Sequence, residues 1–227
     1  MEAMGGDPTP ASKPDARFRT QDHAFVALID GAFADAAARS GPHLLCRPGC
    51  TQCCIGVFAI GPADALRLRQ GLSALKETDP ERAARVKERA AASWARIKPG
   101  FPGDASTGVL DLDNNDVDSN LDCLDSREAS FEDFANDEPC PALDPANGTC
   151  DLYASRPETC RAFGPPVATG EGYGVCELCF QTASAQEVAD AAIVLPADEL
   201  SETLDQAALA AGESPGSTVI AFVLNAV

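Results

Sequence analysis

The stretch from Cys46 to Cys54 reads CRPGCTQCC and places four cysteines within nine residues. Core packing does not explain this density, because a buried cysteine acts there only as a small apolar side chain. Cys50 and Cys53 have the spacing at which two thiolates reach one metal ion. The Pro-Gly pair suits the centre of a type II turn, which would fold the first two cysteines toward each other. The loop therefore predicts a metal-thiolate centre.

The adjacent cysteines Cys53 and Cys54 leave two interpretations open. Neighbouring side chains in an extended segment point to opposite sides, so one ion rarely takes both without strain. Either two metal centres share this loop, or Cys54 is buried or reactive beside a single centre.

A second group of cysteines follows about ninety residues later in a turn-rich segment, and its members are Cys140, Cys150, Cys160, Cys176 and Cys179. Asn147-Gly148 is a strong hairpin signal, which would let Cys140 and Cys150 face each other across two short strands. Joining the two groups would tie distant halves of the chain together.

The residues before Cys160 predict a short helix. Ser155 and Glu158 have the spacing of a capping box, with Ser155 as the N-cap and Pro157 in the first turn. Cys160 would then lie near the amino-terminal half of the helix, where the dipole and positive neighbours favour a thiolate.

Three arginines lie within the cysteine segments, namely Arg47, Arg156 and Arg161. Thiolates that hold a divalent ion or an iron–sulfur cluster keep residual negative charge, which nearby guanidinium groups would offset. Ordinary salt bridges to acidic residues are an equally good interpretation.

The order of these motifs resembles the YkgJ-like CxxxCxxCC cysteine-cluster family of bacterial cytoplasmic proteins, described as zinc- or iron-chelating domains. The resemblance spans residues 43–180 and rests on the 46–54 loop, a Cys140-Pro-x-Leu motif, the Cys150–Phe163 segment and a trailing cysteine. It implies metal binding through Cys46, Cys50, Cys53, Cys54, Cys140, Cys150, Cys160, Cys176 and Cys179, with either Cys176 or Cys179 as the last family ligand.

The resemblance also implies kinship with flagellin lysine N-methylases, which contain a similar cysteine-rich region. The first hypothesis is therefore a cysteine-cluster metal-binding protein. The alternative is an iron–sulfur-dependent enzyme of the protein-modifying or redox class, similar to the lysine N-methylases. No catalytic residue and no protein partner can be assigned from the sequence.

Zinc and iron–sulfur clusters both accept ligation by thiolates alone, so the cofactor is predicted to be one or the other. Eight of the cysteines divide into two sets of four, which suits two zinc ions or clusters. The spacing from Cys46 to Cys53 also matches that of radical-SAM enzymes, but the chain lacks their repeated βα units. His43, three residues before the loop, is a candidate peripheral ligand.

The net charge of −18 is concentrated in one segment. Residues 104–138 hold twelve acidic residues against one arginine, together with Cys123. A calcium site is conceivable at 111–125, but the glycine of an EF-hand loop is missing, so a solvated acidic insertion is favoured. Because this charge repels phosphates and anionic headgroups, neither nucleic acid nor a membrane is an expected partner.

The remaining pattern predicts a mainly α fold with short β-hairpin elements, an irregular small domain organised around the metal-thiolate core. Residues 1–19 are expected to be a disordered tail, followed by a single domain over 20–227. Helices are expected at 21–40, 62–76, 79–97, 182–194 and 197–211, a strand at 55–60, and a strand or helical turn at 217–224.

Residues 1–20 contain no apolar stretch of signal-peptide length, and the longest apolar run, 218–224, is far shorter than a membrane span. We therefore expect a cytoplasmic location. Reduced, metal-bound thiols are accordingly favoured over a framework of disulfides.

Overall fold

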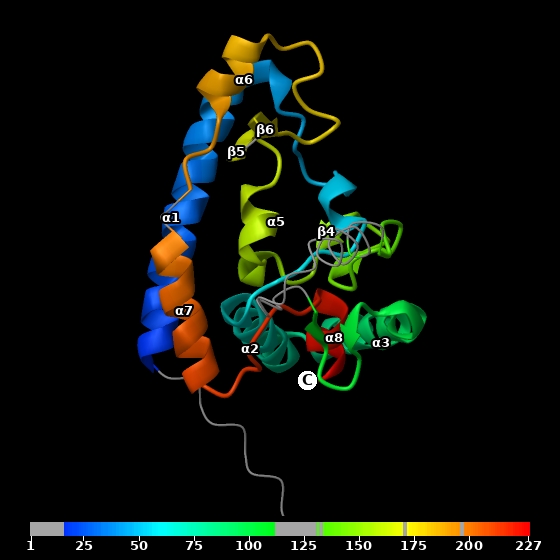
Figure 1. The fold of residues 1–227 in the computed structure, drawn as a ribbon. Coiled ribbons are helices and arrows are strands. Elements are labelled where there is room, and N and C mark those ends of the chain that lie inside the picture. Colours follow the sequence, from blue (N-terminus) through cyan, green and yellow to red (C-terminus); the bar gives the residue numbers. More distant parts are fainter. Residues whose placement is uncertain (1–15, 112–130, 132–133, 170–171, 196–197) are drawn as a thin grey trace, which may run out of the picture.

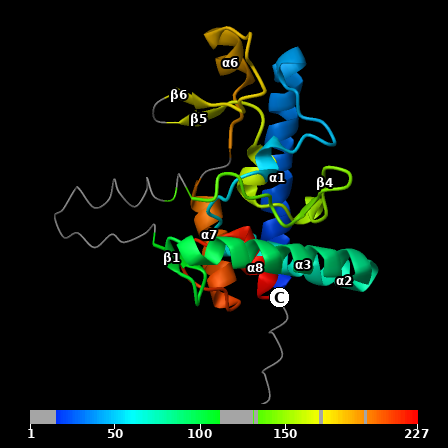
Figure 2. The same cartoon turned by 90° about the vertical axis from the view of Figure 1, so that its right-hand side faces the viewer.

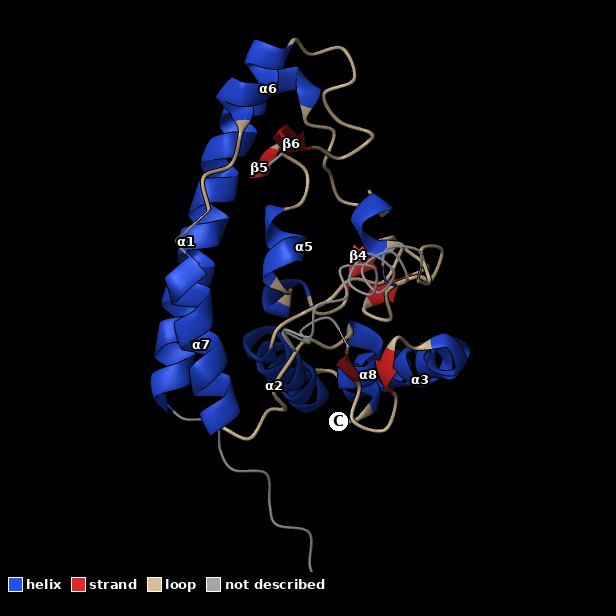
Figure 3. Cartoon of the chain, in the orientation of Figure 1, coloured by secondary structure: helices blue, strands red, loops and turns tan. Residues whose placement is uncertain are grey.

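The structure is a computed structural model that describes residues 16–111, 131, 134–169, 172–195 and 198–227. It is mainly α, as predicted (Figures 1 and 3). The helices are α1 (Ala16–Ser40), α2 (Pro62–Thr78), α3 (Pro80–Ile97), α5 (Glu158–Ala162), α6 (Ala185–Ala191), α7 (Asp198–Ala210) and α8 (Ile220–Asn225). None of these helices has the length and apolar character needed to cross a membrane.

Helix α1 runs along one side of the molecule and packs against α5, α6 and α7 (Figure 1). It starts earlier than predicted, so residues 16–19 are helical and Phe18 is fully buried; residues 1–15 lie outside the described part. Gly41 ends the helix, as predicted, with a positive φ of 51°. Phe25 and Ile29 lie on the inner face of α1 and are buried against α2 and α7.

Helices α2, α3 and α8 form a second unit that lies across α1 (Figure 2). The two predicted helices at 62–76 and 79–97 are confirmed, and Asp79 caps α3 by accepting a hydrogen bond from Arg82 N at 3.0 Å. The N-terminus of α2 is capped by a residue of another helix, because Asp205 of α7 accepts a hydrogen bond from Ala63 N at 2.8 Å. This bond fixes α7 to the start of α2.

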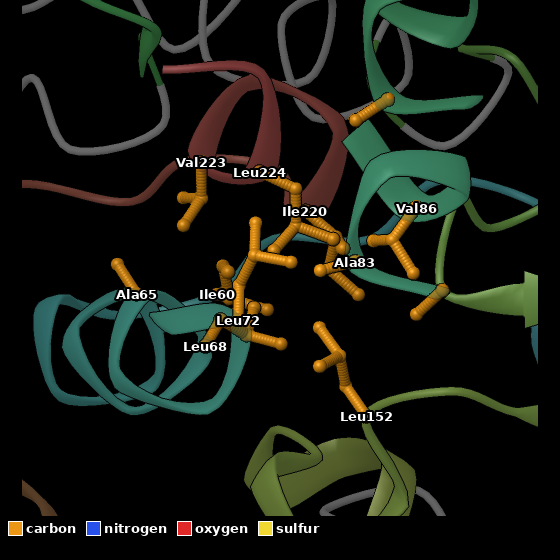
Figure 4. Packing of buried hydrophobic residues seen from close by; sticks show 12 residues of the cluster. Ile60, Ala65, Leu68, Leu72, Ala83, Val86, Leu152, Ile220, Val223 and Leu224 are labelled. Atoms are coloured by element: carbon orange, nitrogen blue, oxygen red, sulfur yellow. The ribbon is translucent and has the colours of Figure 1, made fainter. Parts of the chain in front are cut away.

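The largest buried cluster lies between α2, α3 and α8 (Figure 4). Leu68, Leu72 and Val86 meet Val223 and Leu224 of the last helix there. Leu152, two residues after Cys150, enters the same cluster, and Cys140 and Cys150 pack against it. The apolar core is thus continuous with the second cysteine segment.

Extended structure in the described residues is limited to three antiparallel hairpins: β1 (Gly103–Asp104) with β2 (Val109–Leu110), β3 (Leu143–Asp144) with β4 (Thr149–Cys150), and β5 (Val167–Thr169) with β6 (Gly172–Gly174). The predicted strand at 55–60 is wrong, since only its ends pair, Ile55 with Pro139 and Ile60 with Thr218. The segment bridges two loops instead of joining a sheet.

The C-terminal elements are shorter than their patterns predict. The helices expected at 182–194 and 197–211 are α6 and α7, and the capping box that starts α6 sits at Ser184 and Glu187. Both interpretations of 217–224 hold in part, because Thr218 pairs with Ile60 before α8 begins. Most of the acidic insertion, with Cys123 and the calcium-like pattern, lies outside the described residues.

A buried ion cluster connects α1, α2 and α5. Arg67 is 5% exposed, donates to Asp22 Oδ1 at 2.9 Å and also donates to Asp64. Asp64 in turn accepts from Glu158 N at 3.1 Å, at the first residue of α5. Burial raises the pKa of Asp64 to about 6, and the charge of Arg67 opposes that rise. The Asp64 carboxylate is therefore ionised at neutral pH, and the charge of Arg67 stabilises this ionised form.

Replacing Arg67 should test this dependence. We expect Arg67→Ala to lower the free energy of unfolding by about 3–5 kcal/mol, because two carboxylates would lose their buried partner. Urea denaturation followed by circular dichroism measures the change. Arg85→Ala on the exposed face of α3 is the control and should have almost no effect. Equal denaturation midpoints for the two variants would refute the role of the cluster.

Candidate metal centre

The structure describes nine cysteines, and all nine are free thiols. They come from the 46–54 loop and from the 140–179 segment, as the sequence predicts, and the fold brings the two segments together. The tenth, Cys123, lies outside the described residues. The contacts of the nine thiols separate them into two groups.

The first thiol group consists of Cys46, Cys50, Cys176 and Cys179. Cys46 interacts electrostatically with each of the other three. Leu45 N donates to Cys179 Sγ at 3.4 Å, and Phe180 N donates to His43 O at 3.0 Å. The chain before the loop is therefore joined directly to the Cys176–Cys179 turn, in which Cys179 N donates to Cys176 O at 2.8 Å.

The turn predicted within the loop is present. Gly49 has a φ of 89°, and Cys50 N donates to Arg47 O at 2.9 Å, as a type II turn requires. A Cβ atom at Gly148 would lie 3.2 Å from Gly49 Cα, so the tip of the β3–β4 hairpin packs closely on this turn. Two glycines thus allow the loop and the hairpin to approach.

The second thiol group consists of Cys53, Cys54, Cys140, Cys150 and Cys160. Cys140 N donates to Cys54 O at 2.7 Å, and Gly56 N donates to Glu138 O at 2.9 Å. These bonds join the end of the 46–54 loop to the chain that leads into the β3–β4 hairpin. In that hairpin Cys150 pairs with Leu143, and the predicted pairing with Cys140 across the strands is wrong.

Three thiols lie at the centre of the second group. Cys54 interacts electrostatically with Cys53, Cys140 and Cys150, and Cys160 interacts with the same three. Cys140 interacts with Cys53 and Cys150 as well. Cys53, Cys140 and Cys150 therefore form a trio to which Cys54 and Cys160 are both neighbours.

The thiols differ in acidity because of burial and of one hydrogen bond. A hydrogen bond with Cys54 lowers the pKa of Cys53 to about 6, whereas the same bond and burial raise the pKa of Cys54. Burial raises the pKa of Cys46 and of Cys140 to about 12 in each case. Burial also raises the pKa of Cys160, so the surroundings of this thiol oppose the thiolate that the sequence favours.

The way in which α5 begins explains why the surroundings of Cys160 differ from those predicted. The helix begins at Glu158 with Pro157 as its N-cap, and Ser155 belongs to a separate 3₁₀ turn, so the predicted capping box is absent. The buried carboxylate of Asp64 accepts from Glu158 N in place of the serine. Asp64 also disfavours an ionised Cys160.

The three predicted arginines have different surroundings. Arg156 lies near the second group, where its charge lowers the pKa of Cys53, and it donates to Cys160 O at 3.2 Å. Arg161 is 3% exposed and forms an ion pair with Asp30 at 2.9 Å, which attaches α5 to α1. Arg47 lies in the exposed turn of the loop. The geometry supports an electrostatic role toward the thiols for Arg156.

His43 has contacts away from the thiols. Its ring stacks on Phe180 with 5.6 Å between centroids, and Nε2 lies 3.5 Å from a carboxylate oxygen of Glu187. These contacts hold the chain just before the loop against α6. They favour a packing role over the predicted peripheral ligand.

The sequence pattern missed the acidic and basic residues that hold the second group in place. Asp151 is 8% exposed and accepts from Arg82 and Arg89 of α3 at 2.5 Å each. Arg89 also donates to Pro141 O at 2.9 Å. Arg82 and Arg89 lie seven residues apart on one face of α3, a spacing that favours a shared acidic partner. Nothing in the sequence identifies Asp151 as that partner.

The thiols of each group are neighbours, but they are not arranged around one position that a metal ion could occupy. Within the described residues, no three side chains of His, Cys, Asp or Glu are arranged so that they could hold a metal ion. Metal binding would therefore require the cysteines of each group to rearrange. The donor chemistry itself fits zinc or iron, because both groups consist entirely of sulfur.

Comparison with known proteins agrees with this donor chemistry. Residues 45–180 match the model of the CxxCxxCC family, which is described as a "putative zinc- or iron-chelating domain". The chain belongs to this family. No curated protein and no solved structure matches the chain. The CxxCxxCC match begins one residue before Cys46 and ends one residue after Cys179, so it covers both thiol groups.

Gly164 offers a test of the packing around the first group. Its φ is 130°, and a Cβ atom there would lie 2.7 Å from Cys46 Sγ. We expect Gly164→Ala to lower the free energy of unfolding by at least about 1 kcal/mol, from backbone strain and displacement of the thiol. Chemical denaturation measures the effect.

The matched control is Gly31→Ala in α1, where a Cβ atom would meet nothing within 4 Å. This variant should be neutral or slightly more stable, since alanine is the better helix former. A Gly164 variant as stable as the Gly31 variant would contradict the contact with Cys46.

Proposed function

We propose that this member of the CxxCxxCC family binds zinc or an iron centre through cysteines of its two thiol groups, and that the metal is chiefly structural or held for transfer. The observation that carries the proposal is the gathering of free thiols from two distant segments into two groups. Thiolates favour soft or borderline metals over magnesium and calcium. A bound cation would supply the positive charge that buried thiols need in order to ionise.

The position of the cysteines supports a structural role. The thiols belong to segments that connect α1 to the unit of α2, α3 and α8, and Cys140 and Cys150 border the largest core cluster. Cross-linking these segments through a metal would stabilise both sides at once. Free energies of about 10–16 kcal/mol are typical of structural zinc in small domains.

The same chemistry supports a reducing location. Free thiols in this number persist where disulfides are reduced, so we expect the protein in the cytoplasm, as in the bacterial family that the sequence resembles. The strongly acidic chain disfavours nucleic acid as a partner. The methylase-like enzymatic role stays a prediction that rests on the sequence resemblance.

Metal analysis of the purified protein tests the proposal. After anaerobic purification we expect zinc or iron bound in stoichiometric amounts, measured by plasma mass spectrometry together with acid-labile sulfide. Zinc without sulfide would exclude the iron–sulfur version. Protein that retains neither metal, and that takes up neither zinc nor iron on reconstitution, would refute the proposed function.

Replacing one ligand should couple metal content to stability. We expect Cys50→Ser to reduce the bound metal per chain and to lower the thermal unfolding midpoint, because the hydroxyl is a poor ligand for these metals. Cys123→Ser, outside both thiol groups, is the control and should change neither quantity. Unchanged metal content in the Cys50 variant would remove Cys50 from the site.

A further inference from the structure

We propose that the two thiol groups are two separate metal centres, a closed centre of four cysteines and a second centre in which one of five cysteines is in excess. The inference rests on the proposed function and assigns its ligands. The first centre comprises Cys46, Cys50, Cys176 and Cys179. The second uses Cys53, Cys140, Cys150 and Cys160, and it leaves Cys54 as a neighbouring free thiol.

The backbone separates the two halves of the 46–54 loop. The chain leading into the loop is bonded to the 176–180 segment, through Leu45 N to Cys179 Sγ and Phe180 N to His43 O. The end of the loop is bonded to the 138–140 segment, through Cys140 N to Cys54 O. The hydrogen bonds of the backbone at the two ends therefore go to different segments, while between the ends Gln52 donates to Glu177 and the hairpin tip at Gly148 packs on Gly49.

The change of partner takes place between Cys50 and Cys53. The type II turn ends at Cys50, and a 3₁₀ turn over Gln52–Cys54 follows at once. The strongest thiol interactions stay within each group, since Cys46 interacts most with Cys179 and Cys53 interacts most with Cys54. The two cysteines that the sequence pairs in one metal knuckle thus belong to different centres.

The first group has the composition of a closed structural site. Four thiolates satisfy tetrahedral zinc completely and leave no open position. Cys176 and Cys179 both lie in the buried cluster with Phe180, and both interact with Cys46. Both members of this pair can therefore serve as ligands. The ambiguity between them disappears, because this centre uses both.

The second group has one thiol more than a tetrahedral centre needs. Cys54 and Cys160 each interact with the same three thiols, Cys53, Cys140 and Cys150, so the fourth ligand is either Cys54 or Cys160. Cys53 and Cys54 are adjacent in the 3₁₀ turn, so together they would close a small, strained chelate ring on one ion. Cys160 comes from α5, on a separate segment, and is free of this constraint. We therefore assign Cys160 as the fourth ligand.

Zinc stoichiometry and thiol counting test the assignment directly. In a Cys123→Ser background, the protein is loaded anaerobically with Zn²⁺ and examined by native mass spectrometry. We expect two zinc ions per chain and one thiol that reacts with a disulfide reagent under native conditions. Peptide mapping should identify that thiol as Cys54.

The possible results distinguish a failure of the proposed function from a failure of the division into two centres. No bound zinc would refute the proposed function for zinc, and iron reconstitution would then decide it for iron. One zinc ion per chain would keep the function and overturn the division into two centres. Two ions with Cys160 as the reactive thiol would overturn the assignment of the second centre.

Variants then locate each ion. The double variant Cys176→Ser with Cys179→Ser and the double variant Cys140→Ser with Cys150→Ser should each lose one zinc ion. Cys54→Ser should keep two ions, whereas Cys160→Ser should lose one. Loss of both ions from either double variant, or of one ion from Cys54→Ser, would overturn the ligand assignment.

Cadmium substitution keeps the test valid if a variant fails to fold. The protein with its native thiol groups is loaded with ¹¹³Cd²⁺, a soft ion that thiolates bind well. We expect two cadmium resonances of equal intensity, because the two centres have different surroundings. A single resonance at saturation would overturn the two-centre proposal without any substitution of a ligand.

Discussion

The structure depends on the hydrogen bonds that hold a nine-residue loop between two segments of chain. Leu45 N reaches Cys179 Sγ at one end of the loop, and Cys54 O accepts from Cys140 N at the other. The hydrogen bonds at the two ends of the loop thus go to two different segments. The grouping of the thiols agrees with these bonds and could not be inferred from the spacing of the cysteines in the sequence.

Sequence reasoning succeeded where the determinant was local. The helices at 62–76 and 79–97, the turn at Gly49 and the Asn147-Gly148 hairpin depend on residues close in the chain, and all are present. It failed where a distant residue decided the outcome. Ser155 was a plausible N-cap, but Asp64 of α2 accepts the hydrogen bond from Glu158 N. Likewise, which thiols become neighbours depends on which distant segments meet.

Charged residues outside the cysteine motifs keep the thiol segments in position. Arg67 and Asp64 fix α5, and with it Cys160, to α2. On the other side, Arg82 and Arg89 of α3 fix Asp151 next to Cys150. These ion pairs hold the segments of the second thiol group in place without a contribution from a metal.

The same arrangement explains why a cation fits the second group. Burial raises the pKa of Cys140, Cys150 and Cys160, so these thiols are neutral without a positive charge nearby. Arg156 supplies part of that charge, since it lowers the pKa of Cys53 and opposes the rise at Cys150. One guanidinium does not offset the burial of these three thiols, whereas a divalent ion bound directly to sulfur deprotonates its ligands. The fold therefore places several buried thiols where a thiophilic cation is the most effective source of the missing charge.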